Sequence, residues 1–210
     1  MTRIRSHFGA LAAALALTMA GAAKADPVPF LMTPVAFTPG SGYGVDANEL
    51  VGTLLNVDFA AAIGATSFSL SSVGDSFDLV FGTVTMLESG NINADETDGL
   101  GVVATFGFAD PFTGLRNVFA SGTATTGPVG DPLAIDLTID WNPVLVAFGN
   151  GGVFRIQMST LNFRDTDQAL TQNARVTLLA LSVPEPATLA LAGVALGGLA
   201  LSSRRRRAAA

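Results

Sequence analysis

Cysteine is absent from the 210-residue chain, and histidine occurs once, at His7. The lack of cysteine excludes disulfides, zinc-thiolate sites and a cysteine nucleophile. His7 lies in an N-terminal segment that we expect to be removed, so the mature protein would contain no histidine. That absence excludes Ser-His-Asp and Cys-His catalysis and every histidine-ligated metal site.

Charged residues are also scarce: they make up 13% of the chain, compared with ~25% in typical soluble proteins, whereas 49% of the residues are hydrophobic. This composition argues against a disordered or nucleic-acid-binding chain. The net charge of -6 conceals an acidic middle, since residues 26–183 contain 16 acidic residues, four arginines and no lysine, a net charge of -12. Such a domain repels polyphosphate, so we expect no nucleic-acid partner.

The N-terminal 25 residues have the pattern of a secretory signal peptide. A basic stretch is followed by an apolar run over residues 8–23, and the small residues Ala23 and Ala25 precede Asp26. Small side chains at these two positions are typical of a signal-peptidase cleavage site. The sequence therefore predicts export by the Sec machinery and removal of residues 1–25 by signal peptidase. An uncleaved membrane anchor is the alternative.

The C-terminal end has three parts in a fixed order: the tripeptide Pro184-Glu185-Pro186, an apolar stretch over residues 187–201, and a basic cluster. The basic cluster consists of Arg204, Arg205, Arg206 and Arg207. Fifteen helical residues span roughly 22 Å, which is short for a ~30 Å hydrocarbon core unless the flanking residues contribute. Clustered arginines favour the cytoplasmic side, so the acidic domain would lie on the periplasmic side of the membrane.

This three-part end resembles the PEP-CTERM sorting signal of exopolysaccharide-producing Gram-negative bacteria. Pro184, Glu185 and Pro186 match the tripeptide, residues 187–201 the transmembrane helix, and residues 204–207 the arginine-rich tail. The resemblance covers residues 184–210 and implies that a membrane protease of the exosortase type cleaves near the tripeptide and passes the domain to the cell surface. Two prolines keep this segment extended, as a protease requires. An ordinary C-terminal anchor is the alternative.

Between these ends, residues 26–183 alternate short apolar runs with turn-forming clusters, which predicts an all-β domain. We expect eight to ten strands in a single antiparallel β-sandwich of jelly-roll or immunoglobulin-like type. The clearest strand is 133–140, and residues 102–108 and 154–158 alternate in the same way. Further strands are expected near residues 28–37, 65–72, 117–126 and 174–183.

Two segments of the predicted domain show irregular patterns. In residues 77–87 the apolar phase shifts across Gly82, which predicts a β-bulge there. In residues 46–62, Asp46 and Glu49 could form a helix capping box, whereas the later part of the segment alternates as a strand does. We favour the strand, because the rest of the domain is predicted to be β.

The densest polar cluster, at residues 91–99, is a candidate calcium loop. Oxygen-bearing side chains at Asn91, Asn93, Asp95 and Asp98 are of the kind that calcium prefers. The spacing does not match an EF-hand loop, because the sixth position counted from Asn93 is Asp98 instead of glycine. A solvated acidic loop is therefore the favoured interpretation, and no cofactor is expected apart from this calcium candidate.

Two carboxylate pairs and one tryptophan are the remaining candidates. Asp136 and Asp140 share a face of the predicted strand but would lie about 13 Å apart, too far for glycoside hydrolysis. Asp165 and Asp167 are closer, yet a polar turn explains them. Trp141, at a strand end, could stack on a sugar ring if it is exposed, although a packing role is more common.

These patterns predict a non-enzymatic exported protein that is processed at its C-terminal signal. We expect a structural or adhesive role in the envelope, the exopolysaccharide matrix or a biofilm, with exopolysaccharide as a partner of the domain. Two alternatives remain open: a carboxylate-dependent polysaccharide hydrolase and a calcium-dependent carbohydrate-binding module.

Overall fold

The computed structural model describes residues 26–46, 52–62, 64–131 and 133–182, and this part of the chain is all-β. Alternating apolar and polar residues rich in valine, threonine and phenylalanine build its strands. The elements are β1 (Val28–Pro39), β2 (Val57–Ala61), β3 (Thr66–Leu70), β4 (Ser76–Met86), β5 (Asn91–Ile92), the 3-10 helix η2 (Ala94–Thr97), β6 (Gly101–Asp110), β7 (Gly114–Ala124), β8 (Gly127–Pro128), β9 (Leu137–Trp141), β10 (Val144–Phe148), β11 (Gly152–Met158), β12 (Leu161–Phe163) and β13 (Gln168–Ala180).

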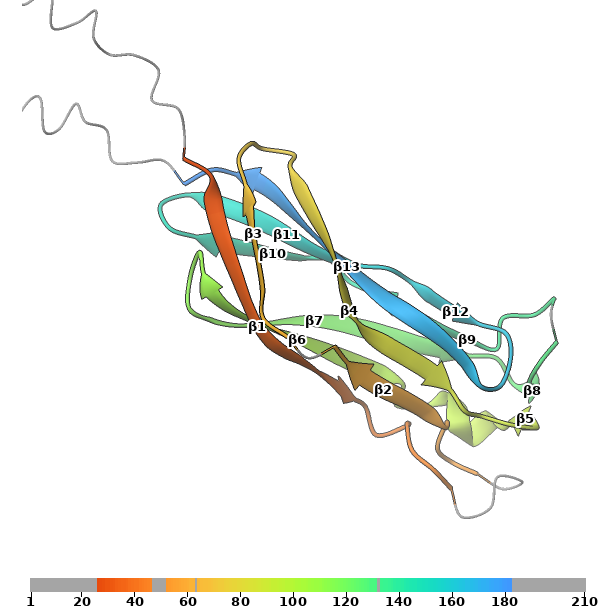
Figure 1. The fold of residues 1–210 in the computed structure, drawn as a ribbon. Helices are drawn as coiled ribbons and strands as arrows, with labels where there is room; N and C mark the ends of the chain where they lie inside the picture. Colours follow the sequence, from red (N-terminus) through yellow and green to blue (C-terminus); the bar gives the residue numbers. More distant parts are fainter. Residues whose placement is uncertain (1–25, 47–51, 63, 132, 183–210) are drawn as a thin grey trace, which may run out of the picture.

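Two antiparallel sheets face each other across one core (Figure 1). Sheet A has the strand order β12-β9-β7-β6-β1-β3, and sheet C has the order β10-β11-β13-β4-β2. Aromatic side chains join the sheets: Phe30 of β1 packs edge-on to Phe154 of β11 at 5.1 Å, and Phe81 of β4 packs on Phe106 of β6 at 4.7 Å between ring centroids. This two-layer arrangement agrees with the predicted sandwich.

Local alternation predicted the inward side chains of several strands correctly. The apolar residues Val102, Ala104, Phe106 and Phe108 of β6 are all buried, as are Phe154, Ile156 and Met158 of β11. The bulge predicted at Gly82 is also confirmed. In the β13–β4 ladder Gln172 pairs with Gly82 whereas Asn173 pairs with Val80, so that Phe81 is the extra residue. Phe81 and Gly82 are both buried, and the phase of β4 changes between them.

The strand predicted at 133–140 is too long at its start. Strand β9 begins only at Leu137, and Leu133 is 90% exposed on a turn. Hydrogen bonds within the turn explain the difference, because Leu133 N donates to the Asp131 carboxylate and Ala134 N to the Asp131 carbonyl. Conversely, β13 begins at Gln168, before the predicted start at 174, because it pairs along the whole of β4.

The ambiguous segment 46–62 contains β2, as favoured, although only over its last part. The Asp46 carboxylate accepts hydrogen bonds from Thr53 N at 2.6 Å and Leu54 N at 2.7 Å. Residues 47–51, including Glu49 of the capping-box alternative, lie outside the described residues.

The described chain enters and leaves the domain at the same end (Figure 1). Val28, near its start, pairs with Leu70, and the following β3–β4 loop binds β13 near its end through Gly74 N to Leu178 O and Leu178 N to Asp75 O. We call this the exit end. The opposite end carries β5, β8 and η2 (Figure 1). Most acidic loop residues lie in η2 or in loops that contact or adjoin these elements: Asp46, Glu88, Asp95, Glu96, Asp98, Asp131, Asp136, Asp165 and Asp167, together with Arg164.

The predicted signal peptide 1–25, with Ala23 and Ala25, and the C-terminal signal 184–210 lie outside the described residues. Asp26, predicted to follow the signal-peptidase cleavage site, is described and exposed. Within the described ranges, no helix has the length and apolar character needed to cross a membrane.

Candidate functional site

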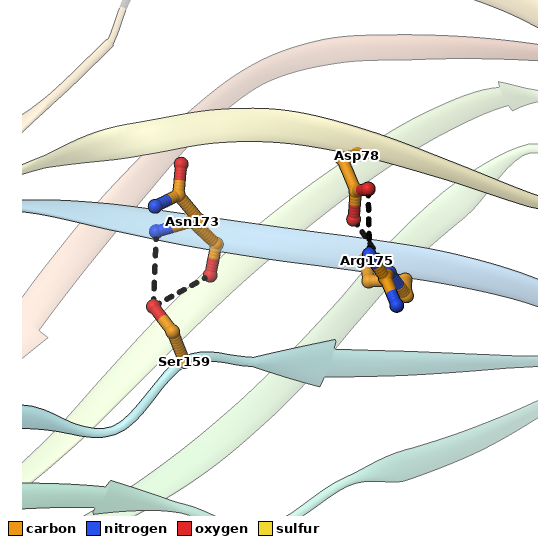
Figure 2. Close-up of polar contacts among 4 residues, drawn as sticks. All are labelled: Asp78, Ser159, Asn173 and Arg175. Carbon is orange, nitrogen blue, oxygen red and sulfur yellow. Dashed lines mark hydrogen bonds and ion pairs between the residues drawn. The ribbon is translucent and has the colours of Figure 1, made fainter.

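A shallow polar depression of about 250 Å³ lies on the outer face of sheet C. Its lining comes from β4, β11, β13 and the residue after β11: Asp78, Gln157, Met158, Ser159, Asn173, Ala174 and Arg175. The polar members lie on this face because side chains alternate along a strand, and residues 173 and 175 face outward where 174 and 176 face the core. Figure 2 shows its main polar contacts.

Asp78 and Arg175 form a two-pronged ion pair across the β4–β13 ladder, in which they are directly opposite each other. Arg175 Nε donates to Asp78 Oδ1 at 2.6 Å and Arg175 Nη2 to Asp78 Oδ2 at 2.8 Å. Hydrogen bonding from Arg175 lowers the pKa of the Asp78 carboxyl below its ordinary value of 3.8. Because both side chains are more than half exposed, water and salt screen their attraction.

Ser159, the residue after β11, is hydrogen-bonded to β13, the strand that carries Arg175. Its hydroxyl accepts a hydrogen bond from Asn173 N at 3.3 Å and another from the buried Gln172 Nε2 at 3.1 Å. The side-chain amide of Asn173 points away from Ser159, toward solvent (Figure 2). The depression therefore offers exposed amide and guanidinium groups at a fixed spacing.

Chemically, this arrangement can hydrogen-bond a polar ligand, but it does not contain an activated nucleophile. Ser159 supplies the hydroxyl group of the depression, and it is hydrogen-bonded to backbone groups of Asn173 and to the Gln172 amide instead of to a general base. Within the described ranges, we find no group of three or more acidic or histidine side chains placed to hold a metal ion.

The calcium candidates occupy different local structures. Asn91 belongs to β5, and Asn93 caps η2, where Glu96 Oε2 accepts a hydrogen bond from Asn93 N at 2.6 Å. Asp95 lies in η2 and Asp98 ends it, both exposed. The Asn93-to-Glu96 spacing is that of a capping box, which the sequence analysis did not identify here.

The two carboxylate pairs are engaged in separate local contacts. The expectation that Asp136 shares an outward strand face with Asp140 is wrong, because Asp136 precedes β9 and is buried, with Gly130 N donating to its Oδ2 at 3.2 Å. Asp140 instead accepts from the Thr160 hydroxyl at 2.7 Å. Asp165 and Asp167 lie on an exposed turn, in agreement with the favoured interpretation.

Trp141 ends β9 as predicted, but only 5% of it is exposed, so it cannot stack on a sugar ring at the surface. Its Nε1 donates to Gln172 Oε1 at 2.9 Å, while Gln172 Nε2 donates to Ser159 O at 2.8 Å. The sequence analysis missed Gln172, because nothing in the alternation of β13 distinguishes an inward glutamine from its apolar neighbours.

Comparisons with known proteins identify one segment of the chain, near its C-terminus. Residues 182–207 match the family model of the PEP-CTERM protein-sorting motif, which confirms the resemblance seen in the sequence. No curated protein and no solved structure matches the chain. The motif begins at Ser182, two residues after β13 ends, so the domain joins its sorting signal directly at the exit end. The chain is therefore an exported protein whose membrane-anchored precursor carries a C-terminal PEP-CTERM motif for recognition by an exosortase, a membrane enzyme.

Proposed function

We propose that the β domain is a non-enzymatic structural or adhesive module, which its sorting signal delivers to the cell surface or to the exopolysaccharide matrix of a biofilm. The observation that carries this proposal is that the chain enters and leaves at one end, while acidic loops gather at the other (Figure 1). A domain attached in this way directs its acidic end away from the attachment point. Charge at that end keeps the domain soluble and available to matrix components.

The proposed processing uses the C-terminal signal in order. An exosortase-type enzyme cleaves near Pro184, Glu185 and Pro186 on the periplasmic side, while the arginines at 204–207 hold the tail in the cytoplasm. The domain leaves the membrane when that bond is cut.

Local carboxylate contacts support a non-catalytic role. Asp136 and Asp140 each bind a different neighbour, and Asp165 accepts from its own loop through Thr166 N at 2.9 Å. The hydrolase and calcium-module alternatives stay predictions, and no contact in the described residues favours either of them.

The test of this proposal is the intact mass and the cell fraction of the protein in its native host. We expect the wild-type mass to end near Pro186 and the protein to occur at the cell surface or in the matrix. A Glu185→Ala variant should keep its full tail and remain in the membrane fraction, because the tripeptide is altered where the enzyme is proposed to bind.

Asp58→Ala is the matched control, since it removes an exposed carboxylate from β2, far along the chain from the tripeptide. We expect this control to be processed like the wild type. A wild-type protein that retains Arg204 to Arg207 in its mature form would contradict the surface proposal and indicate a permanently anchored periplasmic protein.

A further inference from the structure

Four outward side chains of sheet C form an apolar patch with one cation close to where the described chain ends. Leu145 of β10 lies directly opposite Arg155 of β11, and Val153 lies opposite Ala180 of β13. Leu179 is the last outward leucine of β13. Leu145 is 65% exposed and Leu179 is 37% exposed. We name Leu145, Val153, Arg155 and Leu179 the exit patch.

Arg155 is unusual among the arginines of the domain. Arg175 pairs with Asp78, Arg164 donates to Ala134 O, and Arg116 lies over the Phe112 ring and donates to Leu115 O. By contrast, Arg155 Nε is buried without a hydrogen-bond partner, and it is the one such side-chain nitrogen or oxygen in the described part of the chain. A guanidinium with a covered stem and no acidic partner is suited to an external anion at an apolar surface.

The sorting motif begins at Ser182, beside this patch. The Ser182 hydroxyl accepts a hydrogen bond from Asn150 N at 3.1 Å, which fixes the end of the described chain to the β10–β11 turn. The apolar stretch starts at residue 187, five positions after Ser182, and five extended residue steps reach at most about 18 Å. In the anchored precursor, the exit end must therefore lie within that distance of the bilayer.

The distribution of charge also favours an orientation in which the exit end lies closest to the membrane. The acidic loops lie at the far end of the sandwich, and the 13 residues of β13 that connect the two ends span about 40 Å. This length is several times the ~8 Å Debye length at physiological salt, so the distal acids hardly repel an anionic membrane. At the exit end, the Asp75 carboxylate accepts hydrogen bonds from Ser71 N and Ser72 N. Two further exposed acids of this end belong to the side of sheet A, since Asp26 precedes β1 and Asp110 ends β6.

We infer that the exit patch rests on the membrane surface while the precursor is anchored, with its leucines at the headgroup boundary and Arg155 bound to lipid phosphate. Interfacial binding of this kind combines buried apolar area with attraction to anionic lipids. The sandwich then lies with sheet C toward the bilayer and sheet A away from it, and the tripeptide is held at the membrane surface. This inference rests on the anchored precursor and is independent of the adhesive role.

Site-specific labelling can test this orientation, because the chain has no cysteine of its own. The full chain would be reconstituted in phosphatidylcholine vesicles with and without phosphatidylglycerol, carrying a fluorophore on Leu145→Cys. Leu115→Cys is the matched control, since Leu115 is also 65% exposed but belongs to β7 on the opposite sheet. Quenchers carried by the lipid headgroups and quenchers dissolved in water would be applied in turn.

We expect lipid-borne quenchers to act several-fold more strongly on position 145 than on position 115, with a larger difference when phosphatidylglycerol is present. Arg155→Gln should remove the effect of phosphatidylglycerol. Equal quenching at the two positions would overturn the inference, because the domain would then stand on its end or move freely. Protection at position 145 that increases with protein density would also overturn it, since a second copy would cover the patch.

Discussion

Trp141 and Gln172 form a buried hydrogen bond that joins the two sheets, since β9 belongs to sheet A and β13 to sheet C. Both side chains are largely removed from water, and Gln172 satisfies its remaining donors on Ser159 and Asn173 O. A buried polar pair of this kind stabilises the fold only while both partners are present. Its energetic role can therefore be measured by changing one partner and then both.

We predict that Gln172→Leu lowers the free energy of unfolding by about 1–3 kcal/mol, because the Trp141 indole Nε1 loses its acceptor in a buried place. Trp141→Phe should also destabilise the protein, through lost packing. The double variant should lose less stability than the sum of the two single changes, as measured by urea unfolding in a double-mutant cycle. Strict additivity would show that the hydrogen bond contributes nothing.

The Asp78–Arg175 pair predicts a pH dependence of stability. The pKa of Asp78 is lowered in the folded protein, chiefly by its hydrogen bonds to Arg175. The stabilising contribution is therefore present above the ordinary pKa of 3.8 and is lost as the pH falls through the lower folded value. Unfolding free energies of wild type and Asp78→Asn, measured over this range, should converge at the acidic end. A constant difference between them would contradict the assignment.

At the scale of single elements, β4 depends on a glycine at its bulge. A Cβ on Gly82 would collide with Ala60 O of the neighbouring β2 and with the Phe37 ring of the facing sheet. Displacing either group would cost free energy, because Ala60 O belongs to the backbone of a paired strand and the Phe37 ring packs in the aromatic core. The bulge therefore requires glycine for space, since Gly82 has no positive φ.

We predict that Gly82→Ala destabilises the protein by about 1–3 kcal/mol, the range typical of an overpacked interior. Gly64→Ala is the matched control, because nothing lies within 4 Å of the added Cβ there. That control should be neutral or slightly stabilising through the reduced entropy of the unfolded chain. Thermal unfolding of the two variants would measure the difference, and equal effects would exclude the steric explanation.

The sequence predicted elements well where local alternation and burial coincide. The inward positions of β6 and β11 and the bulge of β4 follow from side chains two residues apart along one strand. The predicted strand boundaries were less accurate where a turn or a neighbouring strand decides them. A turn hydrogen bond keeps Leu133 out of β9, and pairing with Met86 extends β13 back to Gln168. The choice between jelly-roll and immunoglobulin-like topology stays a prediction.

At the scale of the whole molecule, the domain has two chemically different ends. Acidic loops occupy one end, and the described chain enters and leaves at the other (Figure 1). The exit patch, which includes Arg155, lies near that second end, because Arg155 pairs with Thr177 and Val153 with Ala180 in the last part of β13. The sorting motif begins at the second end, so in the proposed precursor attachment there would set the orientation of the domain during processing. The proposed adhesive role and the inferred contact with the membrane therefore use opposite ends of the same sandwich.

The sequence by itself determined the sorting signal and the all-β character of the domain. Both are encoded locally: the PEP-CTERM motif is a linear signal of 26 matched residues, and strand alternation repeats every two residues. The burial of Trp141 and Asp136 and the placement of Leu145 opposite Arg155 were decided only by the tertiary structure. These placements depend on the order of the strands and on how the two sheets pack against each other. Residues far apart in sequence carry no local signal of strand order or of sheet packing.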